Sequence, residues 1–256
     1  MQRTSYPDVD RLIDLLLLRI QQSLGPKLVG LYLTGSLVTG DFDHDVSDID
    51  MVAATSTSLD PDELAHLEAM HRAIALSEPK WDNRIEVVYI SVDGLKTFRT
   101  WSSTIAVISP GEPFHTKEAG KDWLLNWYVV REKGRTLFGP SPDTLIDPIS
   151  SEEAVRWVKE HVTAWRGWME KVRTRNAQVY ATLTLCRAFY SVTNRDFVSK
   201  RQAALWVEST MPEWRSLIEN ALRSWRDDWY NDRVDHQASL PETKRFVNAV
   251  IDRIVE

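Results

Sequence analysis

The spacing of apolar residues changes period midway along the chain, and this change restricts the fold to two kinds of layer. Three short apolar runs have the length and composition of buried strands, namely residues 28–34, the run from Asp48 and the run from Arg84. Residues 9–20 and 61–77 instead repeat apolar side chains at helical spacing. From Ser151 nearly to the end, helical spacing continues without a strand pattern. The sequence therefore predicts an α+β protein, with a small mixed sheet in an N-terminal domain and a C-terminal α-helical bundle.

Two turn-rich stretches divide the chain. Residues 108–122 combine Ser, Pro, Gly and charged residues, and 138–150 are again rich in Pro and Gly. We therefore predict a first domain over 1–110, a connecting segment with a short helix over 111–150, and a helical domain over 151–256. In the last of these we place helices at 151–172, 177–193, 200–210, 213–227 and 241–255, with Ser151 and Ser199 as N-caps and Pro212 and Pro241 at helix starts.

Charge is unevenly distributed along the chain. Residues 1–110 hold 16 acids and 9 bases, a net charge of -7, and residues 111–256 hold 21 acids and 22 bases, a net charge of +1. An acidic N-terminal part would repel a phosphate backbone, so nucleic acid is not an expected partner.

No apolar run approaches the ~18 residues of a membrane span, and the N-terminal amphipathic helix lacks a cleavage site. We expect a cytoplasmic monomer. The single cysteine, Cys186, excludes an internal disulfide.

A Gly-Ser turn and an Asp-x-Asp pair carry the first chemical signal. Alternate side chains of a strand share a face, so Asp48 and Asp50 are predicted to point the same way. Two neighbouring carboxylates repel each other unless a cation lies between them, and carboxylate oxygens suit Mg²⁺, with triphosphate oxygens completing its coordination. Gly35 ends the preceding strand and lets the backbone approach a ligand closely. Ser36 offers a hydroxyl and an amide to a phosphate at the start of a short helical turn.

A third acid lies on the next predicted strand. Glu86 is the only charge inside an otherwise apolar run. Burial of an unpaired carboxylate is costly, so Glu86 is predicted to face a metal, a cation or the active-site cleft. The three acids would then form one cluster, in which Glu86 is either a general base or a third metal ligand.

The loop between the Gly-Ser turn and the Asp-x-Asp pair superficially resembles a calcium-binding loop. It contains Asp41, Asp43 and Asp45, but the glycine and the distal glutamate that such loops require are missing. We therefore predict a solvated loop, with His44 exposed and not a metal ligand.

Tryptophan is unusually frequent, with 11 residues in the chain. Helical spacing predicts that most of those in the helical part pack in its core, while one or two line a pocket for a sugar or a base ring. The tryptophans concerned are Trp123, Trp127, Trp157, Trp165, Trp168, Trp206, Trp214, Trp225 and Trp229.

These motifs together resemble a known family. The Gly-Ser turn, the Asp-x-Asp pair and a distant acid on a strand resemble the polymerase-β-like nucleotidyltransferases. The run LTLCRAFYSVTNRDFVSKRQAALWV, from Leu183, closely resembles the helical domain of the streptomycin/spectinomycin adenylyltransferases, which show LTLxR followed by an SK-xxAAxW run. The matching residues are Leu183, Thr184, Leu185, Arg187, Tyr190, Thr193, Ser199, Lys200, Ala203, Ala204 and Trp206, and Leu137–Pro140 matches a turn before that domain. The resemblance covers nearly the whole chain.

The resemblance implies a polymerase-β-like nucleotidyltransferase domain and a helical domain, with ATP and the acceptor between them. Carried over by position, it implies that Asp48 and Asp50 bind Mg²⁺ and that Glu86 is the catalytic base. Phosphate contacts would come from Ser36 and Ser47 in the first domain and from Arg187 and Lys200 in the second. The residues themselves agree, because Arg187 is a lone cation in an apolar run and Lys200 follows the predicted N-cap Ser199. An ordinary ion pair is the alternative for each cation.

The sequence departs from the family before the LTLxR motif. Antibiotic-modifying members carry acids there that meet the cationic drug, whereas this chain has Lys171, Arg173 and Arg175, and only Glu170 is acidic. Acids elsewhere, such as Glu118 or Asp122, are candidates to replace them. The usual Thr-Gly after the tyrosine is also changed, to Thr193–Asn194.

The expected function is Mg²⁺-dependent transfer of AMP from ATP to a hydroxyl of a small acceptor. An aminoglycoside or aminocyclitol antibiotic such as streptomycin or spectinomycin is the expected acceptor, which would make the protein an antibiotic-resistance transferase. Two alternatives remain open. The same transfer could have another metabolite or a protein side chain as its acceptor, or the chain could be a non-catalytic nucleotide-binding module of a regulatory or antitoxin type.

Overall fold

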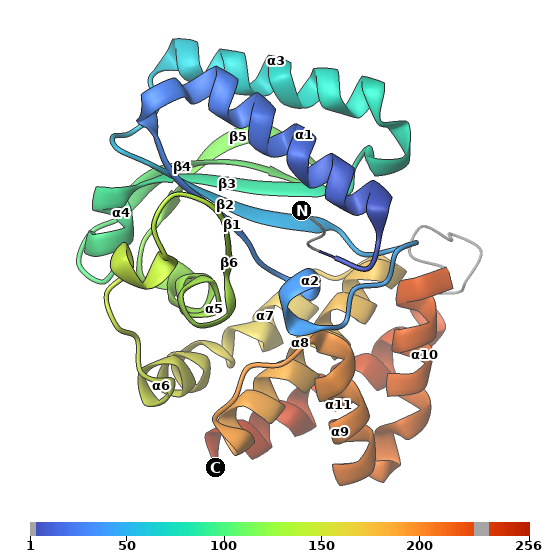
Figure 1. Ribbon diagram of the computed structural model, residues 1–256. Coiled ribbons are helices and arrows are strands. Elements are labelled where there is room, and N and C mark those ends of the chain that lie inside the picture. The colour runs from blue at the N-terminus through green and yellow to red at the C-terminus, as the bar shows by residue number, and fades with distance from the viewer. Residues whose placement is uncertain (1–3, 228–235) are drawn as a thin grey trace. The chain divides into compact units, whose positions relative to one another are not determined.

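In the described part of the chain, six strands from the first unit pair in the order β5-β4-β3-β2-β1-β6 (Figure 1). They are β1 (Leu28–Leu33), β2 (Ile49–Thr55), β3 (Ile85–Ser91), β4 (Ser103–Ser109), β5 (Glu112–Ala119) and β6 (Arg135–Phe138). Only β2 and β3 pair in parallel, and all other neighbours are antiparallel. The computed structural model describes residues 4–227 and 236–256, which divide into two units, Met1–Pro148 and Ile149–Glu256. The predicted α+β class, with a mixed sheet followed by a helical part, is confirmed.

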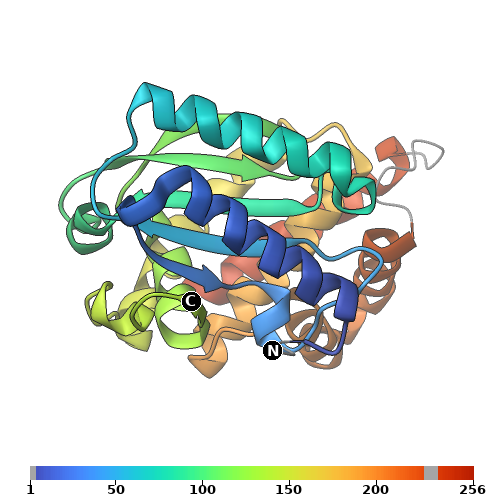
Figure 2. The same cartoon turned by 45° about the horizontal axis from the view of Figure 1, so that its top comes forward.

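Two long helices cover one face of the sheet. The helices of the first unit are α1 (Pro7–Leu24), α2 (Ser36–Thr39), α3 (Pro61–Ser77), α4 (Val92–Thr97) and α5 (Leu124–Lys133). Figures 1 and 2 show α1 and α3 side by side above the strands. Each begins with proline at a position where its missing N–H costs nothing, and Asp60 and Glu63 form a capping box at the start of α3. Their apolar faces are therefore held against the sheet from their first turns.

Alternate residues of the central strands point to the two faces of the sheet. Ile49, Met51 and Ala53 of β2 are at most 1% exposed and pack in the core with α1 and α3. A polar pair also lies in this core, because His71 Nε2 of α3 is 2.7 Å from the Tyr89 hydroxyl of β3. Burial lowers the pKa of His71 to about 4, so the imidazole is neutral at neutral pH.

The region predicted as a connecting segment, 111–150, is instead largely part of the sheet unit. It supplies β5 and β6, which are the two edge strands, as well as α5 between them. The short predicted helix is confirmed as α5, and its residues Leu124, Trp127 and Val130 are buried. The strand β4, which precedes this region, was not predicted either.

The second unit consists of helices packed around α8. Its helices are α6 (Ser151–His161), α7 (Ala164–Met169), α8 (Arg175–Asn194), α9 (Lys200–Thr210), α10 (Arg215–Asp227) and α11 (His236–Val255). The central helix α8 packs against α9, α10 and α11. Its residue Cys186 is fully buried, and burial raises the pKa of the thiol, as expected for an inert small core residue.

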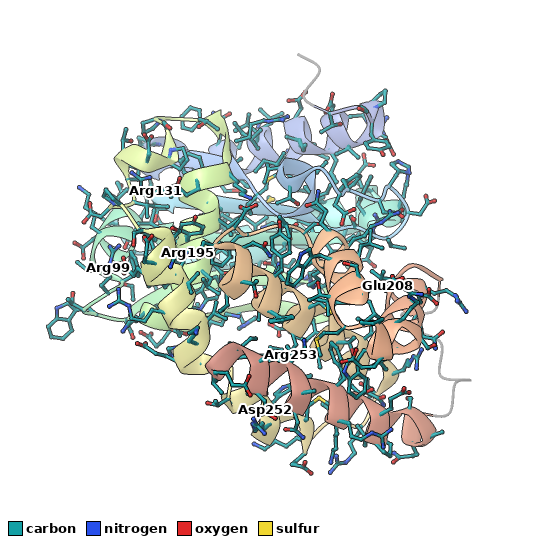
Figure 3. All side chains as sticks on the ribbon, turned by 90° about the horizontal axis from the view of Figure 1, so that it is seen from below. Arg99, Arg131, Arg195, Glu208, Asp252 and Arg253 are labelled. Atoms are coloured by element: carbon teal, nitrogen blue, oxygen red, sulfur yellow. The ribbon has the colours of Figure 1, made fainter. Side chains whose placement is uncertain are left out.

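Ion pairs join the helices of this unit at its surface. Figure 3 labels four of the residues concerned, Arg195, Glu208, Asp252 and Arg253. Asp252 of α11 pairs with Arg166 of α7 at 2.6 Å, and Arg253 pairs with Glu213 at 3.6 Å. Both pairs are well exposed, so each contributes at most about 1 kcal/mol.

Several predicted helix ends differ from the structure. The N-cap of α6 is Ser150, whose hydroxyl accepts the Glu153 N–H, and not Ser151. The single predicted helix over 151–172 is broken into α6 and α7, and Pro241 lies inside α11 instead of at its start. The Ser199 N-cap and the start of a helical turn at Pro212 are confirmed. The packing predictions for Trp225 and Trp229 fall outside the described side chains.

None of the helices in the described part of the chain is both long enough and apolar enough to cross a membrane.

Candidate active site

The turn after β1 brings the backbone against a carboxylate. The ladder continues one residue beyond β1, where the Thr34 N–H donates to the Asp50 carbonyl at 2.9 Å. Gly35 then has φ 64° and ψ -146°, a conformation that essentially only glycine adopts. A Cβ atom on Gly35 would overlap the Asp50 carboxylate. In the structure the backbone at Gly35 lies close to the Asp50 carboxylate, and the predicted approach to a ligand stays a prediction. Ser36 begins the helical turn α2 as expected.

The parallel pairing of β2 with β3 brings two of the three acids together. Asp50 and Glu86 are register partners, and so are their neighbours Ile49 and Ile85, which point into the core from the opposite face. Because register partners share a face, the two carboxylates lie next to each other on the side away from α1 and α3. Both residues are half-buried. Asp48 lies two residues before Asp50 and just outside the strand.

A serine that the sequence did not single out contacts Glu86. The Ser109 hydroxyl, at the end of β4, donates to Glu86 Oε2 at 2.7 Å. This hydrogen bond fixes one carboxylate oxygen and leaves Oε1 to make other contacts. The only sequence signal for Ser109 was its place in an apolar run, 103–109, that was not assigned as a strand.

The residues suit a magnesium site made of two protein ligands. Within residues 4–227 and 236–256, no group of three or more His, Cys, Asp or Glu side chains lies close enough together to hold a metal ion. Mg²⁺ in nucleotide-binding proteins is commonly held by one or two carboxylates together with phosphate oxygens and water. Asp48 and Asp50 carry oxygen donors of this kind, so they fit the predicted role of a ligand pair. Both roles considered for Glu86, general base and third metal ligand, stay predictions.

The loop before Asp48 is more ordered than the sequence indicated. Ser47 is buried, and its hydroxyl accepts the Asp43 N–H at 2.9 Å, so the predicted phosphate contact of Ser47 stays a prediction. His44 is not exposed but half-buried, and its Nε2 lies 2.9 Å from Asp8 Oδ2. The Lys80 ammonium, 2.7 Å from the same oxygen, and then His44 hold the pKa of Asp8 well below its usual range.

The two predicted phosphate-binding cations lie in the second unit. Arg187 is exposed on α8, and its predicted contact with the triphosphate stays a prediction. Lys200 is the first residue of α9, directly after the N-cap Ser199. Its Nζ lies 4.9 Å from the ring centroid of Tyr180, a cation–π contact.

An exposed aromatic group lies beside Lys200. Tyr180 and Trp168 are 42% and 37% exposed, and both rings contact Trp165. The prediction that one or two tryptophans line a pocket for a ring stays a prediction. Other tryptophans, such as Trp206 and Trp214, pack against its core as expected.

The basic stretch before α8 keeps no unpaired acid. Glu170, its only acid, is bonded by Lys244 Nζ at 2.6 Å. The candidate replacement acids are also engaged, because Glu118 accepts the Thr104 hydroxyl at 2.8 Å and Asp122 accepts the Gly120 N–H at 2.8 Å.

Comparisons with known proteins agree with these observations. Residues 144–253 match the family described as "Aminoglycoside adenylyltransferase, C-terminal domain". Two proteins named Aminoglycoside (3'') (9) adenylyltransferase are similar over nearly their whole length. The one from Klebsiella pneumoniae is 23% identical over 254 residues, and the one from Escherichia coli is 22% identical over 252 residues, with 92% of both chains covered in each case.

A solved structure shows the same fold. It is the spectinomycin adenyltransferase AAD(9) from Enterococcus faecialis with ATP and spectinomycin, which superposes with a TM-score of 0.73 at 18% identity. The match covers 96% of this chain and 99% of that one. The fold, the helical-domain match and the full-length relatives together support membership of the aminoglycoside adenylyltransferase family, whose members are nucleotidyltransferases.

Proposed function

We propose that the protein transfers AMP from ATP to a hydroxyl group of an aminoglycoside or aminocyclitol antibiotic. The observation that carries this proposal is the register pairing of Asp50 with Glu86 next to the Gly35 turn. It gives a pair of carboxylates on one face of a sheet, beside a backbone turn that only glycine allows. The names of the relatives, which are aminoglycoside adenylyltransferases, support both the donor chemistry and the acceptor class.

In the proposed reaction, Glu86 takes the proton of the acceptor hydroxyl. The resulting oxygen nucleophile attacks the α-phosphorus of ATP, a new P–O bond forms, and the bond to pyrophosphate breaks. Ser109 keeps the Glu86 carboxylate in one orientation through its hydrogen bond to Oε2. Mg²⁺ bound by Asp48 and Asp50 would supply positive charge against the triphosphate.

The remaining predicted contacts belong to the same proposal. Ser36 and Ser47 would contact phosphate oxygens, with Gly35 allowing the close backbone approach. Arg187 and Lys200 would bind the triphosphate and stabilise the pyrophosphate as it leaves. The exposure of Arg187 and the N-terminal position of Lys200 on α9 support these roles.

The charge next to α8 favours an acceptor with few cationic groups. By the family resemblance, Lys171, Arg173 and Arg175 replace the acids expected in the antibiotic-modifying enzymes, and Glu170 is paired with Lys244. A highly cationic drug such as streptomycin would gain little there. We therefore propose aminocyclitols such as spectinomycin ahead of streptomycin, and a neutral hydroxylated metabolite as the second candidate.

Purified protein with labelled ATP, Mg²⁺ and a panel of acceptors tests the proposal. The panel should contain spectinomycin, streptomycin and neutral polyols, and pyrophosphate release should be measured with each. Glu86→Gln is expected to lower transfer by about 10²–10⁴-fold, with ATP binding within a few-fold of that of the unchanged protein. Asp93→Asn, at an exposed position on α4, is the matched control and should keep full activity.

Different outcomes separate the alternatives. ATP binding in calorimetry without pyrophosphate release for any acceptor would favour a non-catalytic nucleotide-binding module. Full activity of Glu86→Gln would remove the base from the mechanism. Cells that express the protein should become less susceptible to the accepted drug, and unchanged susceptibility across the panel would contradict the resistance role.

A further inference from the structure

Asp48 is the one proposed metal ligand that strand pairing does not hold. Asp50 lies within β2 and is fixed by its register with Glu86 of β3. The ladder begins only at Ile49, so Asp48 belongs to the end of the preceding loop. A rigid metal site needs both carboxylates in fixed positions. Some other contact must therefore hold the backbone at Asp48.

A single residue bonds to the peptide groups on both sides of Asp48. Arg84 donates from Nε to the Ser47 carbonyl at 3.2 Å, and its Nη2 donates to the same oxygen. This carbonyl belongs to the peptide group before Asp48. The carbonyl of Arg84 itself accepts the Ile49 N–H at 2.9 Å, which belongs to the peptide group after Asp48. The backbone of Asp48 is thus fixed from both directions.

The guanidinium group is itself held in place. Its Nη2 also donates to the His44 carbonyl at 3.0 Å, which ties in the earlier part of the same loop. The guanidinium carbon lies 4.6 Å from the ring centroid of Trp81, a side chain only 1% exposed. A planar guanidinium can contact the buried Trp81 ring and still donate hydrogen bonds to the Ser47 and His44 carbonyls. A lysine ammonium offers neither the plane nor several donors in fixed directions.

The charge of Arg84 also opposes the repulsion among the acids. Burial lowers the pKa of Arg84, and the carboxylate of Asp48 gives the largest of the opposing contributions, ahead of Asp45 and Asp43. The positive charge of Arg84 therefore lowers the cost of keeping the Asp48 carboxylate charged.

We infer that Arg84 is a positioning residue for the metal site, whose side chain fixes Asp48 relative to Asp50 through the peptide group before Asp48. The main-chain bond to the Ile49 N–H belongs to the strand pairing and does not depend on the side chain at position 84. This inference rests on the proposed function for the role of Asp48. Its structural part, the ordering of residues 44–49 by Arg84, does not depend on that role. Residues outside the coordination sphere that orient ligands commonly affect metal affinity by about 10–100-fold.

Three variants of the full chain test the inference. Arg84→Lys keeps the charge and loses the planar fork, and Arg84→Gln loses both. Arg72→Lys is the matched control, because Arg72 is exposed on α3 and contacts only Glu68 among the interactions described for it. For each, we would measure Mn²⁺ binding in the presence of ATP by electron paramagnetic resonance, and amide hydrogen exchange over residues 44–49.

Both Arg84 variants are expected to bind Mn²⁺ about 10–100-fold more weakly. They should exchange the amides of 44–49 at least about tenfold faster, with exchange elsewhere in β2 and β3 unchanged. Arg72→Lys should match the unchanged protein in both measurements. Since Arg84→Lys keeps its charge, a loss in this variant points to hydrogen-bond geometry and not to electrostatics alone.

The opposite results are equally clear. Mn²⁺ affinity and exchange rates within twofold of the unchanged protein in Arg84→Lys would overturn the inference. Faster exchange throughout the sheet would overturn it too, since Arg84 would then support the whole fold. If the unchanged protein itself binds no Mn²⁺ with ATP, the proposed function loses its metal site, whereas the exchange comparison still decides whether Arg84 orders the loop.

Discussion

The buried His71–Tyr89 pair should make the stability of the protein depend on pH in a defined window. His71 is only 3% exposed, and its Nε2 lies 2.7 Å from the Tyr89 hydroxyl. Phe114 lies against the imidazole, with the ring centroids 6.0 Å apart, and the described residues include no acid bonded to it. Protonation would place a charge in this apolar core, which is why burial lowers the pKa from 6.5 to about 4.

The sign and size of the effect follow from proton binding. Between pH 6.5 and about 4, the unfolded chain binds a proton at His71 that the folded chain does not. The free energy of unfolding therefore falls as pH is lowered through this window, and the contribution of His71 is fully present above pH 6.5. A difference of this size corresponds to about 3 kcal/mol once both states are protonated, and to about 2 kcal/mol at pH 5.

Urea unfolding at pH 8 and pH 5 measures this contribution. The variant His71→Gln cannot titrate and keeps a polar group near Tyr89, so it should lose about 2 kcal/mol less stability between the two pH values than the unchanged protein does. His66→Gln is the matched control, because His66 is exposed on the same helix. Parallel pH profiles for His71→Gln and the unchanged protein, or an imidazole that titrates near 6.5 by NMR, would refute the reasoning.

Three further substitutions probe the site and the helical unit. Gly35→Ala should cost about 1–3 kcal/mol of backbone strain and displace the Asp50 carboxylate. We therefore expect AMP transfer to fall by about 100-fold in steady-state assays. Near-normal turnover would contradict the close approach of the Gly35 backbone to Asp50. Ser109→Ala should lower kcat by about tenfold with the KM for ATP nearly unchanged, because Glu86 loses a hydrogen bond that orients it; an equal rise in every KM would point to general damage instead. Gln178→Leu should destabilise the second unit by about 2 kcal/mol in thermal unfolding, because the Ser239 and Thr243 hydroxyls both donate to Gln178 Oε1. An unchanged Tm would show that these hydroxyls find other acceptors.

The strands missed by sequence reasoning are those that carry little hydrophobic signal. β5 is an edge strand with exposed or half-exposed residues along most of its length, including Glu112 and Lys117. Edge strands commonly carry charges, which discourage pairing with other chains, so their composition resembles that of a loop. β6 is only four residues long and lies at the other edge. The central strands were predictable because nearly all of their residues are apolar and buried.

Helix ends were missed where contacts distant in sequence decide them. The first turn of α11 lies before Pro241, and Ser239 in that turn donates to Gln178 of α8 at 2.8 Å. Local rules placed the helix start at the proline and had no access to that contact.

Arg187 follows Tyr180 by two helical turns, and both lie on the exposed face of α8. Its apolar neighbours in sequence lie on the other faces of the helix.

The alternation of side chains along strands made one part of the site predictable, namely the pair of Asp50 and Glu86. Alternation places Asp50 on the polar face, and the parallel register with β3 then brings it beside Glu86. Ser109 and the bonds of Arg84 to the loop depend on which strands are neighbours and on where the loop returns. A single sequence does not contain that information, so both residues emerged only from the structure.

The low reactivity expected of the Cys186 thiol makes site-specific labelling of this protein in solution practical. It is the only thiol in the chain, it is fully buried, and burial raises its pKa, so maleimide reagents should leave it unmodified in the folded state. One new cysteine at an exposed position, such as Arg72 in the first unit or Arg201 in the second, would then be the sole reactive group. Two such positions, labelled with a fluorophore pair, would report the distance between the units with and without ATP.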